Sequence, residues 1–573
     1  MKALTFSLAL GMVFAIYLSA ISTLHPSVFW SPDEGAKFIQ MLSRMENGDR
    51  TPPIAYGAAL FDPSYTFYPS APFYPQPLQP KGVHYHWSGL FPLVSYPFYR
   101  LFGVAGLYIV PLLCGFLSTV AAAFLARQLE PHATTSAILV TGLATPLLFL
   151  SVLFLEHTLT GVLGLGALWC GLRFFTGTLW QRVGLALGAA ACLAGLFALR
   201  DEALIFVTAM LLTAVLNWTF SRTITGLRAG LVTTAFLLLL AAAKAGGDVV
   251  GGSNRATELI GNITGALEGL KDPLLWRGLP EHVLNVLVNY PGQLGVPLSQ
   301  EWSLVGLAGV TLCGLSWFML PKPRFSCWFT GACLVGLSSL IGLATEDRYR
   351  AIHGLLLPAP FMVLAWLPTD SGHEKSSRAE RFLMVLFPVY LALYVLITWL
   401  LRRPAGGLEW GTRYALLAYL LAAVLGSVAV TRFAGEYRGW RRLAGLGMAG
   451  LLFILSCGYG VRGIIETQVT KRDLVAFERV IDQADCPILT DQWWLAAALA
   501  PTFVAVPFYT LNPESRFDSW LTGAGARVTS FLFVSYSIPP DAVKTESGPI
   551  LFLTRRTVIQ NMTFSRYTIQ RLP

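Results

Sequence analysis

Long apolar stretches recur along most of this chain and constrain its fold more than any other feature. About 20 apolar residues cross a bilayer as one helix. Hydrophobic residues make up 54% of the 573 residues and charged residues only 13%, a balance that excludes a soluble protein. We therefore predict a polytopic α-helical membrane protein with about thirteen transmembrane helices. The stretches lie at 3–21, 105–126, 134–150, 157–175, 183–199, 203–217, 228–245, 302–320, 326–343, 353–368, 382–401, 414–431 and 442–464.

The basic residues lie mainly in short turns between the apolar stretches. The net charge of +9 is therefore a topology signal, and we predict no nucleic-acid partner. If the N-terminus is cytoplasmic, every second turn lies inside, and those turns should be rich in Lys and Arg. This alternation predicts a cytoplasmic N-terminus and an extracytoplasmic C-terminal segment. The basic turns are RFFTGTLWQR, NWTFSRTITGLR, PKPRF, GHEKSSRAER and TRFAGEYRGWRR.

The stretch SPDEGAKFIQMLSRMENGD, residues 31–49, predicts an amphipathic helix on the membrane surface just after the first apolar segment. Ser31 is a good N-cap, and Glu34 stands where a capping box returns to the Ser31 backbone, so capping alone could explain Glu34. Asp33 has no part in such a box and is a candidate for chemistry. Because cleavage after the weak LSA site would remove the segment that positions this helix, we expect residues 3–21 to be an uncleaved anchor rather than a signal peptide.

Two long loops and the C-terminal segment are predicted on the outer face. Outer loop 25–104 is rich in proline and aromatics, which predicts an ordered platform, and outer loop 246–300 follows later. After residue 464 a helical pattern precedes strand-like CPILTD, a helix at WWLAAALA, and strand-like FVAVPF, VTSFLFVSY, PILFLTRR and YTIQRL. We therefore predict a transmembrane domain at 1–464 and a small extracytoplasmic α/β domain at 465–573.

Ionisable residues gather at the predicted outer ends of the helices. LFLEHTLTG places Glu156 and His157 there, and ALRDEALIF places Arg200, Asp201 and Glu202 in a tight outer turn. Such residues are often interfacial anchors. Crowded carboxylates are nevertheless costly unless a cation, a proton or a ligand lies among them. Glu156 is also neither positive nor paired at i±4, which favours a functional role.

Arginines on the outer face run against the positive-inside bias and need a separate reason. Arginine binds phosphate through two parallel hydrogen bonds and keeps its charge when partly buried, so an outer cluster suits a lipid-linked phosphate. The alternative is local ion pairing within the turns TEDRYR and GGLEWGTRY. The outer arginines are Arg348, Arg350, Arg402, Arg403 and Arg413.

The run GVHYHWSG in outer loop 25–104 contains His84, His86 and Trp87. Histidines at i and i+2 on a strand can share a metal, but no third ligand lies nearby in the sequence. The aromatics of this loop either stack on sugar rings or pack the loop against the membrane domain.

Taken in order, these motifs resemble the membrane glycosyltransferases of the GT-C class, which include the protein O-mannosyltransferases and the aminoarabinose transferase of lipid A. The resemblance rests on the Asp33–Glu34 pair after the first apolar segment and on four later runs. It covers about residues 1–464. The four runs are LFPLVSYPFYRLFGVAGLYIVPLL, LEHTLTG, RDEAL and GGLEWGTRY.

The resemblance implies a transferase that takes a sugar from a polyprenyl-phosphate donor, with inversion at the anomeric carbon, in an active site on the outer face. It implies that Asp33 acts on the acceptor as base or orienting group and that Glu156 is the second acid. Arg200, Arg348 or Arg413 would contact the donor phosphate. These roles suit the reaction, which needs a carboxylate near the developing sugar cation and guanidinium near the leaving phosphate.

Some members of the class hold a divalent metal between acids and a histidine, and others need none. The resemblance makes Glu34, Glu156 and His157 the candidate metal ligands in this chain. The remaining polar and aromatic residues of the outer motifs are candidate substrate contacts. These are Glu34, His86, Trp87, Glu202, Tyr349 and Trp410.

We therefore predict a glycosyltransferase of a bacterial inner membrane that acts on a lipid, glycan or protein acceptor of the cell envelope. The alternative is a transporter or flippase for lipid-linked sugars, which should carry ionisable groups near the bilayer midplane and often two repeated halves. The apolar stretches are nearly free of such groups and show no internal repeat. A scaffold that binds a partner through the C-terminal segment would tolerate changes at Asp33 and Glu156.

Overall fold

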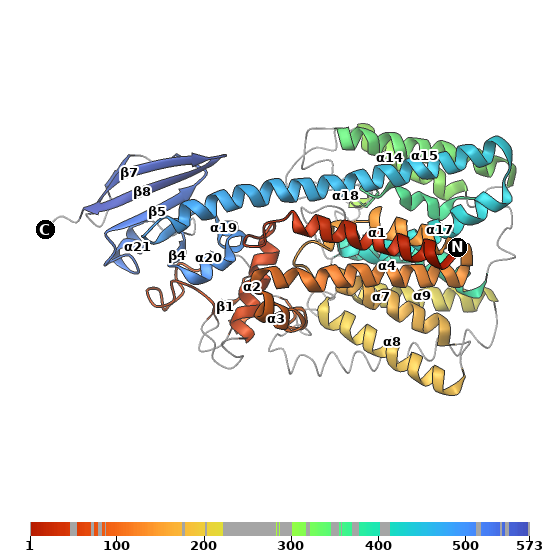
Figure 1. Cartoon of the computed structure of the whole chain (residues 1–573), viewed down its shortest axis with the longest axis horizontal. Coiled ribbons are helices and arrows are strands. Elements are labelled where there is room, and N and C mark those ends of the chain that lie inside the picture. The colour runs from red at the N-terminus through yellow and green to blue at the C-terminus, as the bar shows by residue number, and fades with distance from the viewer. Residues whose placement is uncertain are drawn as a thin grey trace.

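The computed structural model combines a bundle of long helices with a mixed β-sheet. Figure 1 shows the helices side by side at one end of the molecule and the sheet at the other, with α18 (Gly439–Asp482) extending through both. The residues described are 2–45, 54–69, 74–77, 83–85, 87–174, 178–200, 203–221, 282–283, 286, 301–316, 321–344, 355–356, 358–368, 377–400, 413–511, 517–538, 541–544 and 549–570.

The described helices confirm a multi-pass helical membrane protein with a small C-terminal α/β region. Seven stretches are long and apolar enough to cross a membrane, at 4–22, 90–129, 179–199, 324–344, 378–400, 413–436 and 439–482. The predicted total of about thirteen is not confirmed, and the predicted helix at 228–245 lies outside the described residues. The bundle helices are α1 (Lys2–Ser22), α4 (Ile109–Leu129), α7 (His157–Phe174), α8 (Leu179–Leu199), α9 (Ala203–Ser221), α14 (Glu301–Ser316), α15 (Pro321–Ala344), α16 (Arg378–Leu400) and α17 (Leu416–Glu436).

Two predicted spanning helices are interrupted in the structure. The stretch 134–150 is divided into α5 (Thr134–Leu143) and α6 (Leu147–Leu150), because Pro146 lacks an N–H and disfavours helical backbone at the residue before it. The stretch 353–368 contains the 3-10 helix η3 (Pro360–Trp366) instead of a regular α-helix. Short 3-10 helices also precede α4, α5 and α17, namely η1 (Gly103–Tyr108), η2 (Pro131–Ala133) and η5 (Arg413–Ala415).

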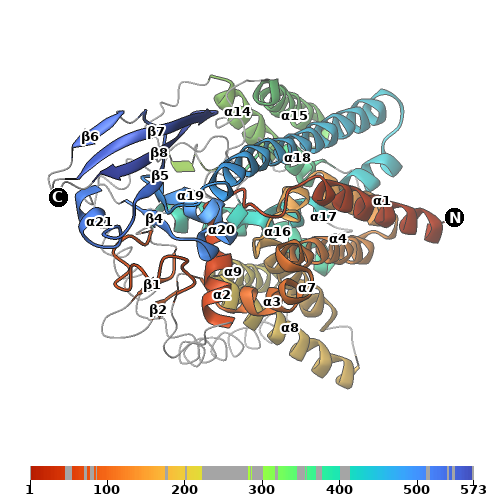
Figure 2. The ribbon, with the colours of Figure 1, turned by 60° about the vertical axis from the view of Figure 1, so that its left-hand side comes forward.

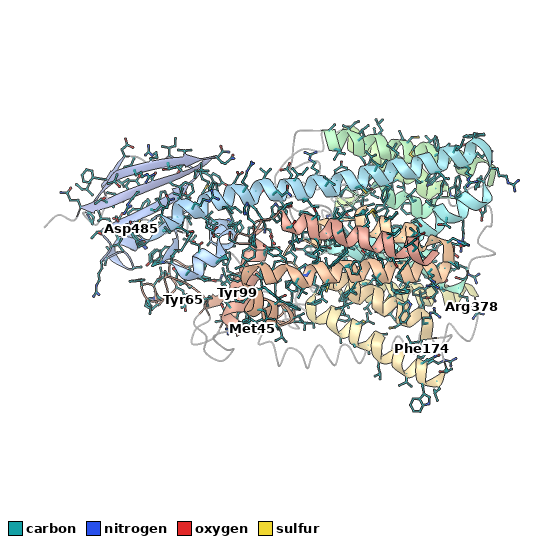
Figure 3. The ribbon with its side chains drawn as sticks, in the orientation of Figure 1. Met45, Tyr65, Tyr99, Phe174, Arg378 and Asp485 are labelled. Carbon is teal, nitrogen blue, oxygen red and sulfur yellow. The ribbon has the colours of Figure 1, made fainter. Side chains whose placement is uncertain are left out.

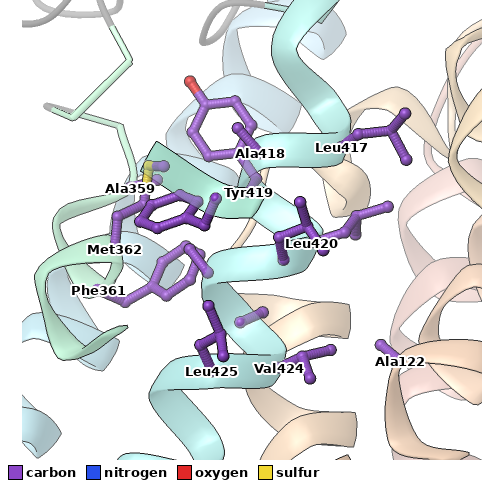
Figure 4. Packing of buried hydrophobic residues seen from close by; sticks show 14 of the residues in the cluster. Ala122, Ala359, Phe361, Met362, Leu417, Ala418, Tyr419, Leu420, Val424 and Leu425 are labelled. Carbon is purple, nitrogen blue, oxygen red and sulfur yellow. The ribbon is translucent and has the colours of Figure 1, made fainter. Parts of the chain in front are cut away.

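Helix α17 is buried along most of its length and packs against α4, α5, α7 and η3. Figure 4 shows Phe361 and Met362 of η3 on one side of α17 and Ala122 of α4 on the other. Lipid tails are as apolar as leucine, so close packing rather than exclusion of water favours this contact within a bilayer. The packing fixes the position of η5, which begins with Arg413 and leads directly into α17.

The predicted surface helix is α2 (Pro32–Met45), but it does not lie on the surface of the protein. Ten consecutive residues, 34–43, are buried, and α2 contacts α3 (Leu90–Phe102) as well as α19 (Trp493–Ala498) and α20 (Ala500–Ala505) of the C-terminal region. Figures 1 and 2 both show α2 between the helix bundle and the C-terminal region. The amphipathic pattern was correct, but protein covers both of its faces.

The C-terminal sheet orders its described strands as β4-β3-β5-β8-β7-β6. Strand β3 runs parallel to both β4 and β5, whereas β5, β8, β7 and β6 pair antiparallel in turn. The strands are β3 (Ile488–Thr490), β4 (Phe508–Thr510), β5 (Ser530–Ser535), β6 (Ala542–Lys544), β7 (Ile550–Ile559) and β8 (Met562–Gln570). Helix α21 (Phe517–Thr522) connects β4 to β5, and a two-stranded ribbon of β1 (Gln76–Pro77) and β2 (Val83–His84) lies in the first outer loop.

Most strand predictions in the C-terminal segment agree with the structure, but two details differ. The run FVAVPF was predicted as a strand, which is wrong, because Phe503 to Ala505 end helix α20 and β4 begins only at Phe508. Pro501 in the first turn of α20 favours a helix start at this point. The helical pattern at 471–483 also continues the preceding apolar stretch within α18, so this helix passes through the predicted domain boundary at 464.

The described ends of the basic turns lie away from the sheet. Figure 3 shows Phe174, at the end of α7, and Arg378, at the start of α16, at the opposite end of the molecule from Asp485. The N-terminus lies at the same end as Phe174 and Arg378 in Figure 1. The arrangement agrees with the predicted grouping of these turns, and which side is cytoplasmic stays a prediction.

Gly35 offers a test of the contact between α2 and the C-terminal region. A Cβ added at Gly35 would lie 1.7 Å from the backbone oxygen of Ala497 in α19. We expect Gly35→Ala to push α2 and α19 apart and to lower the free energy of unfolding by about 1–3 kcal/mol or more. The midpoint of thermal unfolding of the purified protein measures the effect.

The matched control is Gly447→Ala in α18, where an added Cβ meets no atom within 4 Å. Alanine favours helix more than glycine does, so this change should leave the midpoint unchanged or raise it slightly. Equal midpoints for the two variants would contradict a tight contact at Gly35.

Candidate active site

The N-terminus of α2 carries the capping box that the sequence predicted. Ser31 N donates to Glu34 Oε2 at 3.0 Å, and Glu34 N donates to Ser31 Oγ at 3.4 Å. The other carboxylate oxygen, Glu34 Oε1, accepts from Phe154 N at 2.8 Å. Burial raises the pKa of Glu34 above its usual value. The side chain thus caps its own helix and also binds the segment that leads into α7.

Asp33 is the residue before Glu34, but its carboxylate has a different partner. Asp33 Oδ2 accepts from Arg413 Nη2 at 2.6 Å, and the Asp33 side chain is 20% exposed. Burial opposes ionisation of Asp33, but the nearby Arg413 guanidinium and Lys37 ammonium outweigh it, so the pKa of Asp33 lies below its usual value. Asp33 is therefore an ionised carboxylate that remains reachable from solvent.

Glu156 is the buried carboxylate of the site and lies directly before α7. Its Oε1 accepts from Arg200 Nη1 at 2.5 Å, and its Oε2 lies 3.0 Å from Lys37 Nζ. Burial opposes ionisation of Glu156, but Lys37 and Arg200 outweigh it and hold the pKa of this carboxyl well below its usual value. Arg200 occupies the C-cap position of α8, so Glu156 joins α2 and α8 at the start of α7.

An aromatic ring and an imidazole connect the two ion pairs. Tyr414 OH accepts from Arg413 Nη2 at 3.0 Å, and the Tyr414 ring centroid lies 4.4 Å from the Arg200 guanidinium carbon and 4.9 Å from that of Arg413. Such stacking is attractive because the face of the ring carries partial negative charge. Arg200 Nη1 is also 3.4 Å from His157 Nε2. The Asp33 and Glu156 pairs therefore belong to one connected cluster.

Lys37 was not predicted, although the sequence carried a signal for it. The side chain is 2% exposed, and its ammonium lies 4.3 Å from the centroid of the Trp87 ring. Lys37 follows Asp33 by four residues, which places both on one face of α2. A lysine among the apolar residues of an amphipathic helix needs an acidic partner, and that partner is Glu156.

The structure thus brings together residues from five separate parts of the chain. The predicted site residues in this cluster are Asp33, Trp87, Glu156, His157, Arg200 and Arg413, and the additional ones are Lys37 and Tyr414. Among these described residues three cations face two carboxylates, which leaves an excess of one positive charge. Other predicted site residues, namely His86, Glu202, Arg348, Tyr349 and Trp410, lie outside the described residues.

The candidate metal ligands do not form a metal site in this arrangement. Both oxygens of Glu34 accept backbone N–H groups, and both oxygens of Glu156 face cationic side chains. His157 Nε2 faces the Arg200 guanidinium. In the described part of the chain, no three His, Cys, Asp or Glu side chains come together as a metal site would require. A metal requirement stays a prediction of the resemblance.

Comparisons with solved structures found 17 matching chains, among them two structures of one protein. No family model and no curated protein matches this chain. The crystal structure of ArnT from Cupriavidus metallidurans bound to undecaprenyl phosphate has 13% sequence identity and a TM-score of 0.37, over 98% of this chain and 97% of that chain. The same protein in the apo state has 13% identity and a TM-score of 0.36, over 92% of each chain. ArnT is a GT-C glycosyltransferase, the class that the sequence resembles.

Proposed function

We propose that this chain is a membrane glycosyltransferase that moves a sugar from a polyprenyl-phosphate donor to an extracytoplasmic acceptor, with inversion at the anomeric carbon. The observation that carries the proposal is the connected cluster at the N-terminus of α2. There an ionised and partly exposed carboxylate, Asp33, lies beside guanidinium groups that a phosphate could bind. The cluster lies between the apolar helix bundle and the C-terminal sheet, where a lipid-linked substrate and a water-borne acceptor can meet.

In the proposed reaction, an acceptor oxygen attacks the anomeric carbon while the bond from that carbon to the phosphate oxygen breaks. The acceptor proton passes to the Asp33 carboxylate, and the bonding electrons leave with the lipid phosphate. The transition state carries positive charge on the sugar ring and growing negative charge on the phosphate. A fixed carboxylate and fixed guanidinium groups stabilise these charges without having to reorganise during the reaction.

The excess of positive charge supports a phosphate partner. Arg413 and Arg200 lie on the same Tyr414 ring, so their guanidinium planes are held in place before the donor arrives. Guanidinium binds phosphate oxygens in pairs, which fixes the orientation of the leaving group. Glu156 holds Arg200 and Lys37 from the buried side, so its role in this proposal is to position cations rather than to contact the sugar.

The pairing of Asp33 with Arg413 suggests how binding of the donor could raise the proton affinity of Asp33. With Arg413 bound, Asp33 is a weak base. A donor phosphate that takes up Arg413 weakens this ion pair, and the proton affinity of Asp33 then rises. We propose that the acceptor therefore meets a stronger base only when the donor is in place, which limits loss of the sugar to water.

The proposed setting is the inner membrane of a bacterial cell envelope, with the N-terminus in the cytoplasm and the sheet outside. The orientation is supported by the basic turns, whose described ends lie at the same end of the bundle as the N-terminus. The proposed partners are a polyprenyl-phosphate sugar, an acceptor of the envelope and the membrane itself.

The first prediction concerns the proposed base. We expect Asp33→Asn to lower sugar transfer by about 10²- to 10⁴-fold, because an amide cannot accept the acceptor proton. Transfer from radiolabelled polyprenyl-phosphate sugar is measured in membranes that contain equal amounts of each protein. The matched control is Asp482→Asn, an exposed carboxylate at the end of α18, which should transfer at the wild-type rate.

A different result would favour the transporter alternative. If the wild-type protein transfers no sugar but moves labelled lipid across the bilayer, and Asp33→Asn does the same, then Asp33 is not a catalytic residue and the proposed function is wrong.

The second prediction concerns pH. Arg413 holds the pKa of Asp33 below its usual value, so Asp33 stays ionised in mildly acidic solution. Removing the guanidinium by Arg413→Gln should raise the pKa of Asp33, and the acid limb of the pH–rate profile should move to higher pH. The profile is measured as kcat/KM for the donor, which reports the pKa values of the free enzyme, where Arg413 pairs with Asp33.

Arg566→Gln is the control for this experiment, because Arg566 pairs with Asp485 in the C-terminal region, away from the cluster. Its profile should match that of the wild type. An Arg413→Gln profile with an unchanged acid limb would show that Asp33 does not act as the titrating base.

A further inference from the structure

The C-terminal sheet places a second group of polar and aromatic side chains at one edge. In the sheet, β3 lies between β4 and β5. The chain runs from β3 to β4 on one side and then returns past β3 to form β5 on the other side. The strand order therefore reverses between β3 and β5. In open α/β sheets, ligands bind outside the carboxyl ends of the strands at this kind of reversal. Residues 491–494 follow β3 at that edge, and residues 535–538 end and follow β5.

A carboxylate is held in place at this edge. Asp491 Oδ2 accepts from Ser535 Oγ at 2.7 Å, and Asp491 Oδ1 accepts from Gln492 Nε2 at 2.8 Å. Ser535 Oγ also lies 2.9 Å from Ser537 Oγ. Asp491 is nevertheless exposed, and a carboxylate can accept about four hydrogen bonds. The structure therefore presents a fixed acceptor to solvent rather than a closed ion pair.

Aromatic rings flank this carboxylate. The Trp494 and Tyr536 rings lie 6.2 Å apart at 31°, and Trp494 Nε1 donates to Gln492 Oε1 at 3.3 Å. Trp493 is 42% exposed and Tyr536 is 52% exposed. Trp493 and Tyr536 follow Asp491 and Ser535 closely in the chain and keep much of their surface exposed, where a ligand can pack on them.

The combination of groups identifies the class of ligand. A sugar ring presents C–H groups on one face, which pack on an aromatic ring, and hydroxyl groups at its rim, which donate to a carboxylate. An anionic ligand such as a phosphate would be repelled by Asp491. The tail also contains no glycine-rich phosphate loop. The ligand that fits is therefore a neutral carbohydrate.

The edge also lies close to the proposed active site. Trp493 begins α19, and the backbone of Ala497 in the same short helix contacts Gly35 of α2, two residues after Asp33. Four residues of helix advance by only about 6 Å. Tyr74 of the first outer loop donates to Trp493 O at 2.8 Å, so this loop lies against the same edge.

We propose that Asp491, Gln492, Trp493 and Tyr536 form a carbohydrate-binding site at the carboxyl ends of β3 and β5. That the bound sugar belongs to the acceptor rests on the proposed function. In that case the acceptor is a glycan or glycolipid, and the C-terminal region holds one of its sugars while another reaches Asp33.

The test measures sugar binding to the full-length protein in lipid nanodiscs that contain no glycolipid, because alkyl glycoside detergents would compete. The probes are soluble trisaccharides of glucose, galactose, mannose and N-acetylglucosamine, and binding is observed by saturation-transfer NMR. We expect at least one trisaccharide to bind the wild-type protein. Asp491→Asn and Trp493→Ala should each weaken that binding by about tenfold, as expected for loss of a charge-assisted hydrogen bond or of a stacking surface.

Two matched controls separate this site from general surface effects. Asp485→Asn changes an exposed carboxylate that precedes β3, at the opposite end of the same strand. Trp440→Ala removes an exposed tryptophan near the start of α18. Both controls should bind the trisaccharide as the wild type does.

The proposal is overturned if no trisaccharide binds the wild type, or if binding is the same in Asp491→Asn and Trp493→Ala as in the two controls. Tyr536→Ala serves as a third variant should either of the first two fail to fold. A failure of the proposed function appears separately, as absence of sugar transfer by wild-type membranes.

Discussion

The carboxylate of Glu34 accepts backbone N–H groups from Ser31 and from Phe154, and this pair of bonds fixes the start of α2 against the segment before α7. Asp33 directly precedes Glu34 in the chain, and Glu156 follows Phe154 by two residues. The buried Glu34 side chain therefore holds the backbone at Asp33 close to the backbone at Glu156. A buried carboxylate is costly unless it is hydrogen-bonded, so the fold keeps Glu34 in place, and the cluster depends on it.

The other contacts of the cluster compensate the negative charge of the buried Glu156 carboxylate. Glu156 is buried and needs cations, which Lys37 and Arg200 supply from two different helices. Removing one partner of a buried ion pair leaves an uncompensated charge, at a cost of about 3–5 kcal/mol. The electrostatic network thus stabilises the meeting of α2, α7 and α8. It also leaves Asp33, whose side chain is 20% exposed, at the outer side of the cluster, where a ligand can compete for its pairing with the buried Arg413.

The sequence predicted the parts of this site that local patterns encode. Ser31 and Glu34 are separated by the spacing of a capping box, and Glu156 and Arg200 stood out as charges at the ends of apolar stretches. The pairing of Arg413 with Asp33 was not predicted, because it joins residues 380 positions apart. Lys37 was overlooked for a similar reason, since a lysine on the apolar face of a helix indicates that it needs an acidic partner but not that this partner is Glu156, 119 positions away.

The same distinction applies to the fold. Apolar length identified most bundle helices, and alternation identified most strands of the sheet. Neither pattern shows what covers a face, so α2 was expected on the membrane surface although the C-terminal region covers it. The 3-10 helix η3 and the break before α6 arise from prolines within apolar stretches, where hydrophobicity outweighed the turn signal in the prediction.

Helix α18 joins the two ends of the molecule without interruption. Its 44 residues correspond to a rod of about 66 Å, which exceeds the thickness of a bilayer by a wide margin. Lys471 anchors this rod to two other segments, because its Nζ donates to Tyr108 OH at the end of η1 at 2.7 Å and to His25 O at the start of the first outer loop at 3.2 Å. The helix therefore sets the distance between the sheet and the helix bundle. Each residue added to it would move the sheet by about 1.5 Å along the helix axis and turn it by about 100°, so the length of this one helix sets both the distance and the orientation of the sheet relative to the bundle.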